Sequence, residues 1–275
     1  MLPDVLVPLG ADGDGPPLYC VHSATGSCYT YLALAGALDH RPVVGIEAVG
    51  YDGDEVVPAS LADLADHYAQ VVDADRKGRP VCLLGWSMGG VVALEMAERL
   101  RALGCLVPLV VLVDARVPEE EPMPADRLIR ARFVAAFAPG ALGDISARST
   151  ETLRVWAENG SGEDGWEPLR ARGWLPDELD SETLNRRFEV FRNNVRALNQ
   201  HRVAPGHPGP VLVIKAKDSP PESRRWSELA DDVREVTVPG DHHSLWHDAG
   251  LSELTRSIRD ALRQVSATRA RGYAS

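Results

Sequence analysis

The sequence lacks the cysteine spacings that mark zinc sites and disulfide frameworks. Its 275 residues contain four cysteines, and no CxxC pair or Cys/His spacing suggests a zinc site. Cys82 and Cys105 lie within apolar runs, where we expect them to act as small core residues. We therefore expect no metal site, no disulfide and a reducing, cytoplasmic location.

Positive charge and long apolar runs are also scarce. Lys and Arg total 29 against 40 Asp and Glu, which gives a formal net charge of −11. Nucleic acids and anionic membrane surfaces attract Lys and Arg, so we expect neither as a partner. No stretch approaches the roughly 20 apolar residues that span a bilayer. The first residues, MLPDVLVPLGADGDG, lack the basic region and apolar core of a signal peptide.

What the chain does contain is an alternation of short apolar strands with amphipathic helices. Hydrophobic residues make up 44% of the sequence, enough for one large core. Because the strands are continuously apolar, they favour a mostly parallel α/β sheet with helices on both faces. Helices are predicted at 31–38, 61–72, 89–103 and 251–265, followed by a frayed tail from 267. Strands are predicted at 18–21, 42–46, 81–85, 107–113, 210–216 and 233–238.

Between Arg116 and His207 the alternation stops and helices replace strands. The periodicity predicts helices at about 125–137, 150–159 and 181–201. We interpret 1–275 as a single domain with a helical lid inserted at about 117–207. Such an insertion would cap the carboxyl ends of the strands, where open α/β sheets bind ligands.

The linkers of this insertion carry two further expectations. Residues 159–173 are glycine-rich and acidic at their start, and we expect them to be mobile. Trp156, Trp166 and Trp174 lie in or near the linkers. Core packing is the simpler interpretation of each, and contact with a long acyl chain is the alternative.

The stretch GWSMGG at 85–90 lies directly between a predicted strand and a predicted helix. Gly-X-Ser-X-Gly in this setting is the pattern of a nucleophile elbow, a sharp turn that exposes the serine hydroxyl. Its glycines let the strand and the helix approach each other. The Met88 N–H, at the positive end of the helix, can stabilise an oxyanion. Ser87 is the predicted nucleophile; the alternative is a Gly/Ser loop without a chemical role, because the short motif also occurs by chance.

A serine nucleophile needs a base, and the base needs an acid that orients it. The expected chain order is Ser, then Asp or Glu, then His. His242, the first histidine after the last predicted strand, is the predicted base, with His243 as the alternative. The acid stays open: Asp114 ends one strand and Asp218 follows another. Asp241 is a third carboxylate, but neighbours in a tight loop rarely face each other correctly.

A second oxyanion donor is expected from the loop VHSATG, which follows the first predicted strand. Small residues there let the backbone approach a substrate, and we predict the Ala24 N–H as the donor. His22 is predicted to order this loop by hydrogen bonding and not to act as a second base.

Together, the VHSATG loop, the GWSMGG turn, the strand that ends at Asp114 and the loop that carries His242 resemble the thioesterase domains of nonribosomal peptide synthetases and polyketide synthases. The resemblance implies an α/β-hydrolase fold with a mobile helical lid and a Ser-Asp-His triad. It implies Asp114 as the acid, His242 as the base, and Met88 and Ala24 as oxyanion donors. One difference is Ser23, where the family often has proline. The matching stretches are PPLYCVHSATGS, RPVVGIEAVG, GWSMGGVVALEMAERL, VPLVVLVDA, FEVFRNNVRALNQHRV and VPGDHHSLW.

The resemblance also implies an activity. Ser87 would accept a peptidyl or polyketide chain from the phosphopantetheine of a carrier protein and release it by hydrolysis or macrocyclisation, in natural-product biosynthesis. The implied partners are the acyl or peptidyl carrier protein and its acyl chain; no cofactor would be bound by the chain itself. The alternatives are a discrete editing (type II) thioesterase, a general carboxylesterase and a non-catalytic carrier-binding module. The segments VALEMAERLRALG and RFEVFRNNVRAL favour the releasing type.

Overall fold

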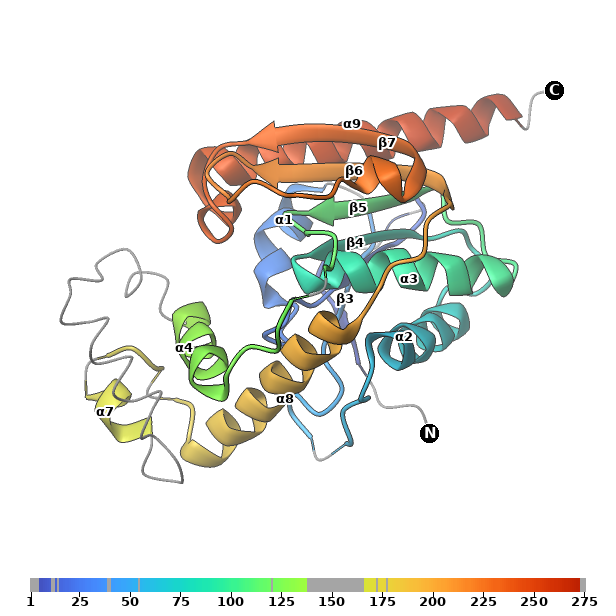
Figure 1. Cartoon of the computed structure of the whole chain (residues 1–275). Coiled ribbons are helices and arrows are strands. Elements are labelled where there is room, and N and C mark those ends of the chain that lie inside the picture. The colour runs from blue at the N-terminus through green and yellow to red at the C-terminus, as the bar shows by residue number, and fades with distance from the viewer. Residues whose placement is uncertain are drawn as a thin grey trace.

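A seven-stranded sheet in the order β1-β3-β2-β4-β5-β6-β7 runs through the described part of the protein (Figure 1). The computed structural model describes residues 5–10, 13, 15–38, 41–53, 55–119, 121–137, 166–171, 173–176 and 178–272. Neighbouring strands are parallel except for β1, which pairs antiparallel with β3. The strands are β1 (Leu6–Pro8), β2 (Leu18–Val21), β3 (Val43–Ile46), β4 (Cys82–Trp86), β5 (Leu109–Val113), β6 (His207–Ala216) and β7 (Ala230–Val238).

The six predicted strands are confirmed, whereas β1 was missed. It has three residues and ends in Pro8, so it carries too few positions to show a period. Strands β6 and β7 each begin three residues earlier than predicted. The cause is a register shift between His207 and Pro210, which lets His207 pair with Ala230 despite the intervening Pro and Gly.

Helices cover both faces of the sheet, as the apolar strands predict. They are α1 (Leu32–Ala37), α2 (Leu61–Asp75), α3 (Met88–Ala102) and α9 (Asp248–Gly272). Helices α2 and α3 lie on one face, α1 and α9 on the other (Figure 1). Successive strand residues point to opposite faces of the sheet. Leu83 packs in the apolar cluster between the sheet and α2 and α3 (the α2/α3 cluster), and Leu84 in the cluster between the sheet and α1 and α9 (the α1/α9 cluster). The helix α9 extends to Gly272, beyond the predicted end at 265.

Short elements complete the layers. Ser60 caps α2 by accepting a hydrogen bond from the Asp63 N–H (3.1 Å). The 3₁₀ turns are η1 (Tyr29–Tyr31), η3 (Trp226–Glu228) and η4 (Ser244–Trp246).

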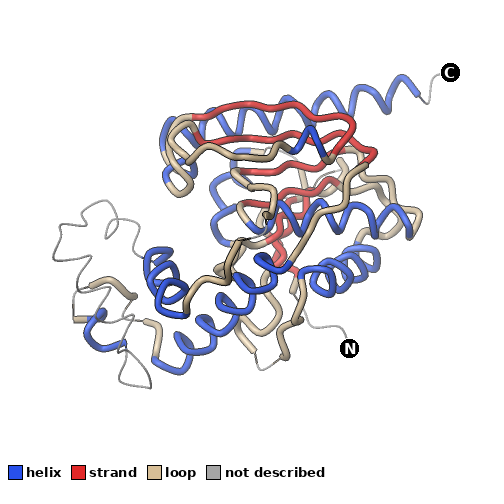
Figure 2. Tube along the Cα trace, viewed as in Figure 1, coloured by secondary structure: helices blue, strands red, loops and turns tan. Residues whose placement is uncertain are grey.

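Between β5 and β6 the chain leaves the sheet and forms α4 (Asp126–Phe137), α7 (Glu167–Arg170) and α8 (Ser181–Gln200). Figure 2 shows these helices projecting away from the sheet, with α8 reaching back toward it. The helices predicted at 125–137 and 181–201 are confirmed. The helix predicted at 150–159, Trp156 and most of the segment 159–173 lie outside the described residues. The insertion has its own apolar cluster: Ile129, Phe133, Val134, Trp166, Leu169, Leu175, Leu184, Phe188 and Phe191.

Close backbone approach at two glycines sets the geometry of the turn after β4. A Cβ built on Gly85 would lie 2.0 Å from the Gly89 carbonyl carbon. A Cβ on Gly89 would lie 2.4 Å from Val21 O and 2.5 Å from His22 O. The helix α3 therefore begins directly against the end of β2, at a distance that only glycine permits.

We expect Gly89→Ala to lower the free energy of unfolding by about 1–3 kcal/mol or more, because the added Cβ meets rigid backbone. The matched control is Gly36→Ala in α1, where a Cβ meets nothing within 4 Å. That variant should be neutral or more stable by about 0.5–1 kcal/mol. Urea unfolding measures both, and a Gly89→Ala midpoint equal to that of the wild type would contradict the packing described here.

Candidate active site

Ser87 occupies a strained turn between β4 and α3. Its φ of +57° and ψ of −126° lie outside the regions that residues with a side chain ordinarily adopt. A hydrogen bond from Ser87 N to Val113 O (2.9 Å) fixes the turn against β5. Met88 is the first residue of α3, so its N–H has no acceptor four residues earlier within the helix. The turn thus has the backbone geometry that an exposed serine hydroxyl requires.

Asp114 and His242 are brought together from positions 128 residues apart. His242 Nδ1 lies 2.7 Å from Asp114 Oδ2. The Ala216 N–H donates to Oδ1 of the same carboxylate (2.9 Å), and Ser219 Oγ donates to Oδ2 (2.6 Å). Burial alone would raise the pKa of Asp114, but the hydrogen bonds from these three groups hold it below its usual value. An ionised carboxylate only accepts, so Nδ1–H of His242 donates and Nε2 is left as an acceptor.

The other two carboxylates lie elsewhere. Asp218 is exposed, and no hydrogen bond joins it to His242. Asp241 accepts two backbone N–H groups of its own turn, at 2.9 and 2.8 Å, and so organises the loop that carries His242. The structure therefore brings Asp114, and neither of the alternatives, against the histidine ring.

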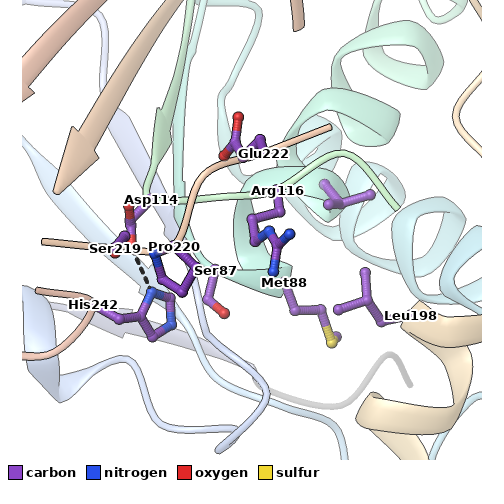
Figure 3. A pocket seen from close by; sticks show the side chains of 10 residues that line it. Ser87, Met88, Asp114, Arg116, Leu198, Ser219, Pro220, Glu222 and His242 are labelled. Atoms are coloured by element: carbon purple, nitrogen blue, oxygen red, sulfur yellow. Dashed lines mark hydrogen bonds and ion pairs between the residues drawn. The ribbon is translucent and has the colours of Figure 1, made fainter. Parts of the chain in front are cut away.

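A cavity of about 290 Å³ opens at this point (Figure 3). Figure 3 shows the Ser87 side chain beside the His242 ring, although no hydrogen bond joins them in this structure. Helix α8 contributes Leu198 to the wall, so the insertion helps to form the cavity. The residues that line it are Ser87, Met88, Val91, Asp114, Arg116, Leu198, Ser219, Pro220, Glu222 and His242.

Several residues that support Asp114 and His242, directly or through a neighbour, were missed by sequence reasoning. The ring of Trp86 lies against that of His242, with centroids 5.0 Å apart and planes inclined by 36°. Tyr31 OH accepts from the Trp86 N–H (3.0 Å) and donates to Val21 O (2.5 Å), which joins the ends of β4 and β2. Trp86 is an X in the Gly-X-Ser-X-Gly pattern, and Ser219 belongs to no motif, so the sequence carried no signal for either.

His243, the alternative base, has a different environment. Its ring packs edge-on against Trp86, with centroids 5.6 Å apart. Burial and the neighbouring His242 lower the pKa of His243. Its ring forms no hydrogen bond or ion pair with a carboxylate among the described residues, whereas that of His242 does.

His22 orders the loop after β2, as predicted. Its Nδ1 lies 2.6 Å from Ser23 O and its Nε2 lies 2.8 Å from Tyr68 Oη. A carbonyl oxygen only accepts, so Nδ1 carries the proton and Nε2 accepts from the tyrosine hydroxyl. Burial lowers the pKa of His22 to about 4, so the ring is neutral at neutral pH.

Ala24 lies in the turn that follows, which the Gly26 N–H closes by donating to Ser23 O (3.0 Å). Its side chain packs between the α2/α3 cluster and the apolar cluster of the insertion. It is not among the residues that line the cavity.

Comparison with known proteins identifies the family. A family model described as "Thioesterase domain" matches residues 16–159. The chain belongs to the thioesterase domain family. The thioesterase domain is 34% identical to "Dimodular nonribosomal peptide synthase" of Bacillus subtilis over 164 residues, 58% of this chain and 7% of that protein. It thus spans a small part of such synthetases. It is 25% identical to "Probable thioesterase gloN" of Glarea lozoyensis over 273 residues, 89% of each chain.

Solved structures share the fold of this thioesterase domain. The four-domain nonribosomal peptide synthetase holo-AB3403 matches with a TM-score of 0.79 and 24% identity, over 94% of this chain and 20% of that one. The NocB thioesterase domain, in covalent complex with a fluorophosphonate nocardicin G analogue, matches with a TM-score of 0.67 and 24% identity, over 94% and 99% of the two chains. The α/β-hydrolase fold is therefore confirmed. Within the described residues, no helix has the length and apolar character to cross a membrane.

We expect the buried, neutral His22 to make stability depend on pH. Its pKa is about 4 in the folded protein against about 6.5 unfolded, so the unfolded chain takes up the proton first as the pH falls. This contribution is complete above pH 6.5 and should decline by about 3 kcal/mol on going to pH 4. Urea unfolding of the wild type and His22→Gln across this range isolates it. Parallel pH profiles for the two proteins would contradict the assignment.

Proposed function

We propose that this thioesterase domain removes an acyl chain from the phosphopantetheine arm of a carrier protein through an acyl-Ser87 intermediate. Release would follow by hydrolysis or macrocyclisation. The observation that carries the proposal is the convergence of a strained Ser87, His242 and an Asp114 held ionised by three hydrogen bonds at one cavity. Membership of the thioesterase family supports a thioester as the substrate, and the synthetase relatives support a carrier protein as the partner.

In the first half of the reaction, His242 Nε2 takes the proton of the Ser87 hydroxyl, and Oγ attacks the thioester carbonyl. The Met88 N–H and the Ala24 N–H stabilise the resulting oxyanion. When the C–S bond breaks, the pantetheine sulfur leaves with the proton from His242. Asp114 keeps the Nδ1–H tautomer and stabilises the charged ring during the transfer.

In the second half, water or a hydroxyl or amine of the acyl chain itself attacks the Ser87 ester. His242 accepts the proton of this nucleophile and then returns it to Ser87 Oγ as the C–O bond breaks. Water gives the free acid, and an internal nucleophile gives a ring. The phosphopantetheine belongs to the carrier protein throughout, so the domain needs no cofactor of its own for either half.

We also propose that residues 1–275 act as one domain and that the insertion at 117–207 is its lid. The support is local: α8 contributes Leu198 to the cavity wall, next to Met88 and Val91 from α3. An acyl chain bound to Ser87 would therefore lie against the insertion.

A discrete editing thioesterase is the second candidate, with the same fold and triad. The relative named "Probable thioesterase gloN" favours it, because the match covers 89% of that protein, so that relative consists almost wholly of the matched thioesterase region. A general carboxylesterase remains the alternative from outside the thioesterase class.

We expect Asp114→Asn to lower kcat/KM for an acyl-pantetheine thioester by about 10⁴-fold, because His242 loses the acceptor that fixes its tautomer. The matched control is Asp218→Asn, which should stay within about two-fold of the wild type, since Asp218 is exposed and does not contact His242. Thioester hydrolysis, followed by release of the free thiol, measures both variants. The opposite ranking would place the acid on Asp218.

The same assay with the matching oxygen ester separates the substrate classes. We expect the carrier-bound thioester to be processed faster than the oxygen ester of the same acyl chain. Rapid turnover of the oxygen ester together with no release of carrier thiol would instead establish a carboxylesterase.

A further inference from the structure

Asn194 is a polar residue on the buried side of α8. Its side chain is 1% exposed, and it follows Leu184, Phe188 and Phe191 along the buried face of the helix. Its Nδ2 donates a hydrogen bond to Ala24 O (3.1 Å), which lies 170 residues earlier in the chain. Its Oδ1 is buried and has no hydrogen-bond partner among the residues that the structure describes. A buried acceptor without a partner destabilises a fold, so stability alone does not account for an amide at this position.

The hydrogen bond from Asn194 restrains Ala24, the residue whose N–H is the proposed second oxyanion donor. The peptide that carries the Ala24 N–H is held through Ser23 O, which accepts from His22 Nδ1 (2.6 Å) and the Gly26 N–H (3.0 Å). In a trans peptide the C=O and N–H point in opposite directions, so these two bonds restrain the Ala24 N–H from the side of the core. The next peptide is held by Asn194. Ala24 is thus fixed on one side by the core and on the other by α8.

We propose that Asn194 is a positioning residue, whose hydrogen bond to the Ala24 carbonyl aligns the oxyanion donor only while α8 of the insertion is in place. The proposal rests on the function proposed above. It links the binding of the acyl chain to the alignment of the oxyanion donor, because α8 also contributes Leu198 to the cavity wall one turn beyond Asn194. An acyl chain that contacts this face of α8 then bears on the same helix that aligns the donor.

The test compares substitutions at Asn194 with one at its neighbour. Asn194→Leu removes both the donor and the unpartnered oxygen at similar volume, and Asn194→Ala removes them without the risk of overpacking. Asn193→Leu is the matched control: the same residue type, half-buried on the same helix, without a hydrogen bond to the loop. We expect both Asn194 variants to lose about 10-fold to 100-fold in kcat, with KM within about two-fold. The control should keep its kcat.

Urea unfolding separates positioning from stability. Because Asn194→Leu removes a buried unpartnered oxygen, we expect its unfolding midpoint to equal or exceed that of the wild type while kcat falls. A loss of kcat that is matched by a loss of folding stability in both Asn194 variants would overturn the proposal, as would a kcat equal to that of the wild type.

The affinity for a transition-state analogue separates a role in positioning the oxyanion donor from a purely structural role. An acyl-pantetheine trifluoromethyl ketone adds the Ser87 Oγ to its carbonyl carbon, and the hydroxyl proton passes to His242. The adduct places an oxyanion opposite the two N–H donors. We expect its affinity to weaken in the Asn194 variants by the same factor as kcat/KM. The affinity for the corresponding amide, which is not attacked, should not change; equal weakening of both ligands would overturn the proposal.

Ser87→Ala distinguishes this proposal from the one on which it rests. Full thioester turnover by Ser87→Ala would refute the acyl-enzyme mechanism itself. An inactive Ser87→Ala together with fully active Asn194 variants would refute only the role of Asn194.

Discussion

The positions of Ser87 and Met88 relative to the loop that contains Ala24 depend on the close contact between the first turn of α3 and the backbone at the end of β2. That contact exists because Gly89 lacks a Cβ, which would otherwise lie 2.4 Å from Val21 O. It places Met88, at the N-terminus of α3, next to the loop that contains Ala24. The same turn forces Ser87 to a φ of +57°. Strain of this kind costs of order 1–3 kcal/mol, and the surrounding parallel strands β2, β4 and β5 stabilise it.

The electrostatic part of the site is built from the neighbouring strand ends. A buried carboxylate is costly unless donors surround it. Asp114 receives them from β6 through Ala216, from the following loop through Ser219, and from the loop after β7 through His242. Its lowered pKa keeps Asp114 charged at neutral pH. Three loops that are distant in sequence are thereby held together at the carboxyl edge of one sheet.

The sequence predicted the parts of this site that follow from local rules, and the structure supplied the parts that depend on contacts across the fold. Ser87 was predicted from a motif between a strand and a helix, and His242 as the first histidine after the last predicted strand. The choice between Asp114 and Asp218 could not be made from spacing, since both end strands at the same edge; the 2.7 Å contact separates them. Ser219, Trp86 and the Asn194–Ala24 bond carry no periodic or motif signal. The strand β1 was too short to be detected.

The central claim is a covalent acyl-Ser87 intermediate formed from a thioester. Its most direct test is intact-protein mass spectrometry of the domain mixed with an acylated carrier protein and quenched within the first turnovers. The account predicts a mass increase equal to the acyl group, located by peptide mapping on the fragment that contains Ser87, and no increase for Ser87→Ala. Product release at full rate without any acylated protein, or an adduct at another residue, would contradict it.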